Sequence, residues 1–488
     1  MDSTILFVVL LAAPAAAAGI SLLPREGIEI TASIVGAAAS VTLALLLLLL
    51  RVTGDYGNFY SDGLTQIMAI TVSSIYLTSL VYSVFYVKRI KEPLFRFRWY
   101  YSLVDLFAFT MLLAIVVNDI GFIWISIEAT TVTSALLVAL ERKSTSIESA
   151  WRYTLIVSAG LATSLLSVVF VYFSQGTITI PDLTGKPVIN STIMALAVGF
   201  ALVGYGTKAG IAPMHAWLPD AHSEAPSPIS AMFSGILLPT SLYAFVRTFV
   251  LIQGSSIFEP MKNLTIGFGI FTALVAAVII AAQRNYKRML AYSSMENMGI
   301  ILVGLALGGI GAIGAIIQIV AHAFAKSSAF YEAGNILASY DSKSMIEVQG
   351  VIGRLRSTGY LFSLSCLSVT GAPPFGVFIG EFLILAQAID SDNYLLAALL
   401  ALAYMYAFIG LNRQSIQMVF GESKSDSSPA PANASGLRVG QETNLVAQQG
   451  IKEDRISVIV PAINLFVSLI IGVYMIPTLV QAAVSLGL

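Results

Sequence analysis

Residues 200–230 read FALVGYGTKAGIAPMHAWLPDAHSEAPSPIS, and this stretch decides how the chain is interpreted. An apolar run of the kind that crosses a membrane carries Lys208 in its middle and is interrupted at Pro213. Proline removes a backbone hydrogen bond, and unpaired backbone groups are tolerated in a bilayer only where protein or a wet cavity satisfies them. The stretch therefore predicts a broken transmembrane helix with a buried ammonium group beside the break.

A second apolar run, SVTGAPPFGVFIGEFLIL at 368–385, has the same pattern. Glycine and proline interrupt it, and an ionisable residue, Glu381, follows within about two turns. Paired broken helices at corresponding positions indicate inverted repeats with an ion site near the membrane midplane. The alternative interpretation is that the prolines only kink two packed helices.

The composition predicts an all-α polytopic membrane protein. Of the 488 residues 57% are hydrophobic and only 11% are charged, whereas soluble domains carry about 25% charged residues. Apolar runs of about 20 residues indicate transmembrane helices. About fourteen such spans are expected, near 4–23, 28–50, 63–87, 100–118, 120–140, 151–174, 191–217, 228–252, 263–282, 288–309, 311–338, 357–389, 394–420 and 456–486. The net charge of -1 implies no bulk attraction for nucleic acid.

The charge of the loops predicts the orientation of the chain in a cell membrane. Basic residues gather in alternate loops, which places these loops in the cytoplasm and both termini outside. The first run opens with Asp2 rather than a basic segment and is expected to be a retained span, not a cleaved signal peptide. The basic residues on the cytoplasmic side are Arg25, Lys88, Arg89, Lys91, Arg96, Arg98, Arg142, Lys143, Arg284, Lys287, Arg288, Lys343, Arg354, Arg356, Lys452 and Arg455.

Five segments follow from the spans and the repeats. The only long polar stretch, 421–455, is rich in Ser, Pro and Ala and is expected to be a flexible cytoplasmic linker. The expected segments are an N-terminal three-helix segment at 1–98, a first five-helix repeat (helices 4–8) at 99–252, a second, inverted repeat (helices 9–13) at 253–420, the linker at 421–455, and a C-terminal transmembrane helix at 456–488.

Ionisable residues inside the spans are the candidate site for ion translocation: Glu128, Lys208, His322, Lys326 and Glu381. A charge at the bilayer centre costs at least about 2.5–3.5 kcal/mol, so such residues usually face an interior path. Burial lowers the pKa of a lysine and a nearby carboxylate raises it again. A lysine and a glutamate in alternating contact are therefore predicted to load and release a proton. The alternative is a static ion pair that joins two helices.

Further candidates have weaker support. Asp105 and Glu296 lie in or near spans, but each could also sit at the membrane interface. His215, Asp220 and His222 flank the first break, and their spacing matches no compact metal site, so loop shaping or proton uptake is the better interpretation. Cys366 is the only cysteine, which excludes a Cys-rich metal or iron–sulfur centre within this chain. We expect no cofactor in this chain.

KAGIAPMHAWLPDAHSEAPSPISA at 208–231 resembles the signature of the antiporter-like proton-channel subunits shared by respiratory complex I, Mrp-type sodium/proton antiporters and group 4 membrane-bound hydrogenases. The resemblance spans roughly residues 60–420. NDIGFIWISIEATTVTSALLVAL, IESAWRY, RMLAYSSMENMGI and HAFAKSSAFYEAGNI are most similar to the F subunit of hydrogenase 4 and its relatives in formate hydrogenlyase-type complexes.

The resemblance implies fourteen helices with two inverted five-helix repeats, broken helices 7 and 12, and a hydrated midplane axis of charged residues. It matches Glu128 to the family's glutamate of helix 5 and Lys208 to its lysine of helix 7. His322 with Lys326 matches the helix 11 pair, and Glu381 matches the ionisable residue of helix 12. It also implies other membrane and peripheral partner subunits, with nickel–iron and iron–sulfur centres among them.

Two departures from the family pattern concern the link between the halves. Pro239 stands where many relatives carry a lysine in the eighth helix, and Asn297 stands where a histidine is common. The sequence thus predicts a proton-translocating subunit of a redox-driven complex, of the hydrogenase or complex I type, that is itself not the redox enzyme. The alternatives are a Mrp-type antiporter subunit and an inert membrane scaffold. The sequence does not distinguish protons from sodium ions, nor identify the electron donor and acceptor.

Overall fold

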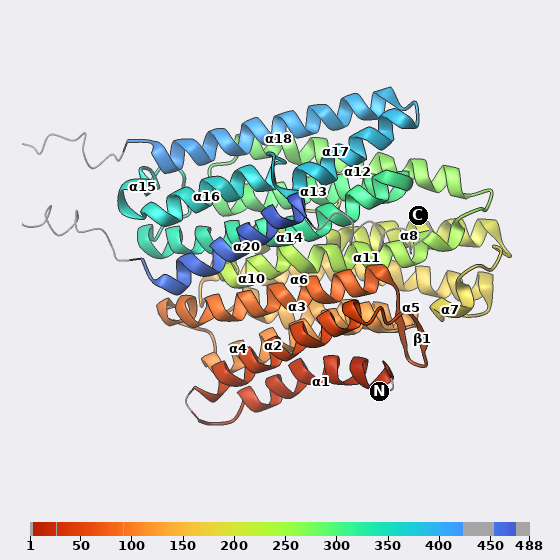
Figure 1. Ribbon diagram of the computed structural model, residues 1–488, viewed down its shortest axis with the longest axis horizontal. Helices are drawn as coiled ribbons and strands as arrows, with labels where there is room; N and C mark the ends of the chain where they lie inside the picture. Colours follow the sequence, from red (N-terminus) through yellow and green to blue (C-terminus); the bar gives the residue numbers. More distant parts are fainter. Residues whose placement is uncertain (1–2, 26, 91, 423–452, 475–488) are drawn as a thin grey trace, which may run out of the picture.

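Long apolar helices make up almost all of this protein. The computed structural model describes residues 3–25, 27–90, 92–422 and 453–474. The helices lie side by side in a bundle with α1 at one edge and α18 at the opposite edge (Figure 1). In the described part, thirteen helical segments are long and apolar enough to cross a membrane. The chain is therefore a multi-pass membrane protein.

The longer helices, in chain order, are α1 Ser3–Ser21, α2 Ile28–Leu49, α3 Gly63–Tyr86, α4 Phe97–Val116, α5 Ile120–Val138, α6 Ser144–Gln175, α8 Ser191–Ala209, α11 Leu238–Phe249, α12 Phe258–Ala282, α13 Tyr286–Leu307, α14 Gly309–Tyr340, α16 Arg356–Val369, α17 Gly376–Asp390, α18 Tyr394–Phe420 and α20 Arg455–Val473. The shorter elements are α7 Ile180–Leu183, α9 Leu218–Glu224, α10 Ser227–Met232, α15 Val351–Arg354, a π-helical turn η2 at Phe233–Leu237, and the 3-10 turns η1 Val87–Arg89 and η3 Val250–Ile252.

The predicted twelfth span, 357–389, is formed by α16 and α17 together, because each of these helices is too short to cross a membrane alone. Spans seven and twelve are not kinked helices. Helix α8 ends at Ala209 and α9 begins at Leu218, while α16 ends at Val369 and α17 begins at Gly376. The interpretation of both prolines as simple kinks is therefore wrong. One small element was not predicted: an antiparallel hairpin of β1 (Gly54–Tyr56) and β2 (Phe59–Ser61) lies between α2 and α3.

The termini of the chain lie partly outside the described residues. Most of the linker predicted at 421–455 falls there, as does the end of the C-terminal helix predicted at 456–488. Helix α20 is the described part of that helix, and it packs against α14, α16, α17 and α3. The ends of α18 and α20 that flank the linker lie at the same end of the bundle as α15 (Figure 1).

The packing order of the helices occurs twice. In one set α4 packs on α5, α5 on α6, α6 on α8 and α8 on α11, and α11 returns to α4 and α5. In the other set α12 packs on α13, α13 on α14, α14 on α16 and α17, and both of these on α18, which returns to α12 and α13. This order is the one that two five-helix repeats would produce.

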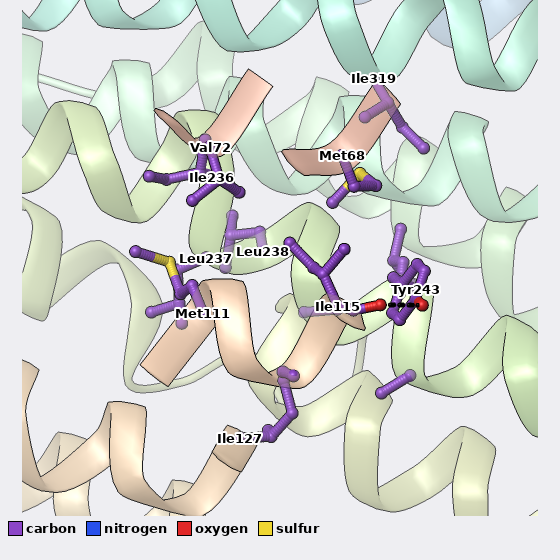
Figure 2. Close-up of a cluster of buried hydrophobic side chains, with 14 of the residues drawn as sticks. Met68, Val72, Met111, Ile115, Ile127, Ile236, Leu237, Leu238, Tyr243 and Ile319 are labelled. Carbon is purple, nitrogen blue, oxygen red and sulfur yellow. Dashed lines mark hydrogen bonds between the residues drawn. The ribbon is translucent and has the colours of Figure 1, made fainter. Parts of the chain in front are cut away.

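A buried hydrophobic cluster joins the N-terminal helices to the middle of the bundle (Figure 2). Met68 on α3, Met111 on α4 and Ile236 on η2 are 0–1% exposed. At the edge of the cluster the Tyr243 hydroxyl donates a 2.6 Å hydrogen bond to the backbone carbonyl of Ile115. Since Ile115 is the penultimate residue of α4, the tyrosine pairs a carbonyl that the helix end leaves free.

Arg247 forms a buried bidentate ion pair with Asp62. The Arg247 Nη1 and Nη2 atoms lie 2.5 and 2.8 Å from the Asp62 carboxylate oxygens. Nη2 also donates to the hydroxyls of Thr65 and Tyr243, at 2.9 and 3.0 Å. This cluster holds the end of α11 against the start of α3, where the Asp62 side chain caps the helix by accepting from the Thr65 amide.

We predict that Arg247→Ala lowers the free energy of unfolding by about 3–5 kcal/mol, because it leaves the Asp62 carboxylate buried without its partner. The measurement is unfolding in mixed micelles with a denaturing detergent. Arg152→Ala, which removes ion pairs of an exposed arginine with Glu148 and Asp220, is the control and should cost less than about 1 kcal/mol. Equal losses for the two variants would contradict the prediction.

Glu224, the last residue of α9, forms a second polar cluster that joins α9 to the start of α6 and to the loop that carries Lys343. Its Oε1 atom lies 2.8 Å from the Lys343 ammonium, and its Oε2 atom accepts a 3.0 Å hydrogen bond from the Thr145 hydroxyl. Burial raises the pKa of the Glu224 carboxyl, but the Lys343 charge and the Thr145 hydrogen bond outweigh burial and hold the pKa below its usual value. The ionised carboxylate thus stabilises this end of the broken span.

The stability contributed by Glu224 is therefore expected to depend on pH. Because the folded pKa is lowered, the contribution is fully present above the unfolded value of about 4.3 and is lost as pH falls through the folded value. Thermal unfolding of the wild type and Glu224→Gln should differ at pH 7 and converge below about pH 4. Glu259→Gln, at an exposed site, serves as the control. A wild-type advantage that persists undiminished at low pH would count against this role of Glu224.

Candidate functional site

The first break is stabilised by protein groups, as a break inside a membrane requires. The Trp217 indole donates a 2.8 Å hydrogen bond to the backbone carbonyl of Thr207 in the last turn of α8. The Ala212 amide donates to the Thr272 hydroxyl on α12 at 3.0 Å. Gly210, with φ 79°, turns the chain out of the helix. Helix α8 therefore ends one residue after Lys208, and the hydrogen bonds of Trp217 and Thr272 fix the position of this end.

The Lys208 side chain is fully buried and reaches α5. Its Nζ atom donates to the backbone carbonyl of Ile127 at 2.8 Å and to the Thr131 hydroxyl at 2.5 Å. These two acceptors flank Glu128 on the same helix, and the Glu128 carboxylate acts electrostatically on the ammonium. The structure thus brings together the predicted lysine and glutamate of the first half.

Lys208 and Glu128 do not form a static ion pair. Within the described chain no carboxylate oxygen lies within 4.0 Å of Lys208 Nζ. Glu128 is half-buried, its Oε1 atom accepts a 2.7 Å hydrogen bond from the Ser158 hydroxyl, and its Oε2 atom has no partner among the residues that the structure describes. The ammonium is thus held by neutral oxygens beside a carboxylate with a free acceptor.

The second half repeats this arrangement on α13 and α14. Lys326 is fully buried, and its Nζ atom donates to the backbone carbonyl of Leu290 at 2.7 Å and to the Ser293 hydroxyl. Both acceptors lie on α13, which carries the buried Glu296 one turn further on. The Glu296 carboxylate accepts a 2.8 Å hydrogen bond from the Asn297 amide. Glu296, ranked below the main candidates from sequence, is therefore the counterpart of Glu128.

Glu381 lies at the second break, close to Glu296. It is 6% exposed and begins the second turn of α17. Gly371, at φ 68°, makes room for it, since a Cβ atom there would overlap the Glu381 carboxylate. A cavity of about 440 Å³ opens beside Glu381, lined also by Thr370, Tyr404 and apolar side chains of α17 and α18.

The break itself is tied to α13 and α18. The Asn297 amide donates at 3.4 Å to the carbonyl of Val369, the last residue of α16. Asn412 on α18 donates a 2.8 Å hydrogen bond to the Thr370 hydroxyl. Gln318 on α14 donates to the Asn297 carbonyl oxygen at 2.9 Å. Asn297 thus links the break to Glu296.

Two fully buried histidines lie between the halves. His222 on α9 packs between the rings of Phe233 and Phe330, at centroid distances of 5.6 and 5.5 Å. His322 on α14 lies beside the backbone of Ser234 on η2. None of the four ring nitrogens has a hydrogen-bond partner among the described protein atoms. His322 and Lys326 share α14, but they contact different neighbours.

His215 and Asp220 are not part of either charged set. The His215 ring lies edge-on to Tyr292, with 6.3 Å between the ring centroids. Asp220 pairs with Arg288 at 2.8 Å and with Arg152 at 3.4 Å. In the described residues no group of three or more His, Cys, Asp or Glu side chains is arranged to hold a metal ion.

Asp105 is buried, but away from both lysines. Its carboxylate accepts hydrogen bonds from the hydroxyls of Tyr76 at 2.5 Å, Ser33 at 2.7 Å and Ser21 at 3.3 Å. These side chains come from α3, α2 and α1, so Asp105 on α4 ties the N-terminal helices together. The side chain is 0% exposed, so the surrounding helices enclose the carboxylate completely.

Several buried polar residues were missed by the sequence analysis. Lys287, expected in a basic loop, is 1% exposed and donates a 2.6 Å hydrogen bond to the carbonyl of Ala225. Glu332 is fully buried beside Asn335. Glu332 lies six residues after Lys326 and therefore on a different face of α14, so helical spacing gave no signal for it.

Comparison with known proteins agrees with this geometry. The NADH:quinone oxidoreductase/Mrp antiporter transmembrane family matches residues 117–407. The hydrogenase-4 component F homolog of Methylacidiphilum infernorum is 31% identical over 440 residues, covering 85% of this chain and 92% of that protein. A Na(+)/H(+) antiporter subunit of Bacillus subtilis is 26% identical over 77% of this chain and 76% of its own length.

Solved structures share the fold. A chain of the membrane-bound sulfane sulfur reductase, an archaeal respiratory membrane complex, superposes with a TM-score of 0.85 at 20% identity, covering 98% of this chain and 97% of that one. A chain of the Mrp complex from Dietzia sp. gives 0.82 at 19% identity, covering 99% and 98%. With its broken helices and buried lysines, this chain belongs to the NADH:quinone oxidoreductase/Mrp antiporter family of membrane subunits.

Proposed function

We propose that this chain translocates protons as the antiporter-like membrane subunit of a redox-driven complex, of the group 4 hydrogenase or complex I type. One observation carries the proposal: the same lysine arrangement occurs in both halves. Each buried ammonium binds a carbonyl and a hydroxyl of the neighbouring helix, and that helix carries a buried or half-buried glutamate. A membrane scaffold without a transport function would not need two buried ammonium groups, since burying a charge in the membrane costs free energy.

The arrangement favours a lysine that moves between two states. Neutral oxygens compensate an ammonium less well than a carboxylate does, so a protonated Lys208 gains by approaching Glu128, and a neutral one gains by remaining on Ile127 and Thr131. A small motion thereby couples the position of Lys208 to its protonation. Lys326 with Glu296 works in the same way in the second half, and Glu381 at the second break accepts or supplies the proton there.

The translocated ion is proposed to be a proton. A lysine side chain can lose a proton as an ammonium and regain it as an amine, whereas its ammonium form repels a sodium ion, which needs oxygen ligands. Each half has a lysine at its centre, so a path through either half suits protons better than sodium. His215, near the first break, is half-buried and suits proton uptake from the aqueous side.

The packing order supports the predicted segments. We assign 99–252 and 253–420 as two inverted repeats, because the helices within each segment pack against one another in the same order. The segment 1–98 forms a separate three-helix unit that Asp105 ties to the first repeat. The orientation follows from the basic loops, which places α15 and the linker in the cytoplasm and both termini outside.

Cofactors are proposed for the partner subunits rather than this chain. The relatives include a hydrogenase-4 component homolog and subunits of NADH-quinone oxidoreductase. Nickel–iron and iron–sulfur centres are thus expected in the other subunits, which would bind next to this one. The second candidate, a Mrp-type antiporter subunit, rests on the likeness to the Bacillus subtilis antiporter protein and involves no redox partner.

Lys208→Ala and Glu128→Ala are predicted to reduce proton pumping by about 100-fold or more, within the range for loss of a positioned acid or base. Pumping is measured by dye quenching in inverted membrane vesicles during turnover of the whole complex. Assembly is checked by size-exclusion chromatography, and Lys186→Ala, at an exposed loop position, is the control. Wild-type pumping by an assembled Lys208→Ala complex would refute the mechanism.

Purification in mild detergent through a tag on this chain should recover iron–sulfur and hydrogenase-like subunits, as identified by mass spectrometry. This result is expected because a redox-driven pump must contact the module that supplies its energy. Recovery of small membrane subunits alone would transfer the assignment to the Mrp-type antiporter. Sodium-dependent transport would then be measured in the same vesicles.

A further inference from the structure

We propose that the hydroxyls of Ser234 and Ser294, with the imidazoles of His222 and His322, form the proton path between the two lysine sites. This inference rests on the proposed function and adds the residues that join its two halves. The helix between the halves, formed by α10, η2 and α11, carries no Asp, Glu, Lys or His side chain. Any path across it must use other groups.

The serine pair lies at the contact between the halves. The Ser234 and Ser294 hydroxyl oxygens are 2.6 Å apart, either one can be the donor, and both residues are fully buried. Ser234 belongs to η2 in the first repeat and Ser294 to α13 in the second. A short hydroxyl pair in which either member can donate is suited to pass a proton in either direction.

Ser294 reaches the Lys326 site directly. Its hydroxyl donates a 3.0 Å hydrogen bond to the carbonyl of Leu290, and Lys326 Nζ donates to the same oxygen at 2.7 Å. Ser293, which accepts from Lys326, also donates to Leu290, at 3.2 Å. The ammonium and the Ser294 hydroxyl therefore share one acceptor, and a small motion of the lysine side chain brings them into contact.

The π-helical turn explains why Ser234 is in this position. A π turn inserts one extra residue and reorients the side chains around it. Gly235, the next residue, packs so closely on α14 that a Cβ atom would lie 2.9 Å from the Ser327 hydroxyl and 3.0 Å from the Ala323 carbonyl. This contact presses the turn against the helix that carries His322 and Lys326.

The two imidazoles connect Ser234 to the first half. Lys208 binds Thr131, and the nearby Tyr153 hydroxyl lies 2.7 Å from that of Ser134. The Phe233 ring lies next to both the Tyr153 ring, with 5.7 Å between the ring centroids, and the His222 ring, with 5.6 Å between the ring centroids. His322 lies beside Ser234.

The buried ring nitrogens of His222 and His322 fit this role. Four buried polar atoms without protein partners would each cost about 1–3 kcal/mol, which favours bridging water at this point. An imidazole gives up a proton from one nitrogen as it takes one at the other. Each serine likewise donates its proton onward while accepting another, so every group keeps its proton count and one proton crosses.

The test uses the assembled complex in inverted vesicles, with Lys208→Ala run in parallel. Ser234→Ala, Ser294→Ala and the double variant are each expected to pump about tenfold or more slowly, below the full effect of losing an acid or base. Because the two hydroxyls act as a pair, the double variant should lose no more than either single one. Ser294→Thr, which keeps a hydroxyl, should restore pumping.

The control is Ser468→Ala, which removes a buried hydroxyl paired at 3.1 Å with Ser368, away from the path. Near-wild-type pumping by the assembled double variant, with Lys208→Ala inactive, would overturn the serine path but leave the proposed function intact. Full pumping by Lys208→Ala would overturn the proposed function itself. If the double variant does not assemble, equal pumping by Ser294→Thr and Ser294→Ala overturns the path.

Discussion

The hydrogen bonds of the Lys208 ammonium to the Ile127 carbonyl and the Thr131 hydroxyl are the interaction on which the rest of the structure depends. A charge in the membrane must be held by protein oxygens, and these oxygens must be placed before the lysine can be buried. Helix α5 therefore packs near the end of α8, and α8 must stop there. Trp217 and Thr272 in turn bind backbone groups on either side of the point where α8 stops.

The same constraint acts again in the second half, with different residues. Lys326 lies in the middle of an unbroken helix, and the break falls instead beside Glu381. The link between this break and the lysine site is made by Asn297, whose hydrogen bonds join Glu296, Gln318 and the end of α16. The two halves thus share an arrangement of charge rather than a residue-by-residue match. Between them the chain uses hydroxyls and imidazoles, which cost less to bury than an additional ammonium.

Much of this fold could be predicted from residue types alone. Long apolar runs determine the spans, because only helices satisfy the backbone within lipid. Gly and Pro after Lys208 and before Glu381 marked both breaks, and the structure confirms them at 210–217 and 370–375. Hydropathy marked the boundaries of the helices less accurately. Helix α6 begins at Ser144 rather than near residue 151, because its first two turns are helical although their side chains are mostly polar. The sequence did not indicate the partners of Asp105, which are hydroxyl donors from three other helices that compensate its burial.

The sequence by itself determined the fold class, the broken helices and most of the buried charges, because hydropathy and proline chemistry are local properties of the chain. The partner of each charge was decided only by the tertiary structure. Glu128 and Lys208 are 80 positions apart, and the acceptors of Lys326 lie more than thirty positions before it. The Ser234–Ser294 contact, the π turn and the fit of Glu381 over Gly371 likewise depend on which helices pack together, and no local pattern specifies that.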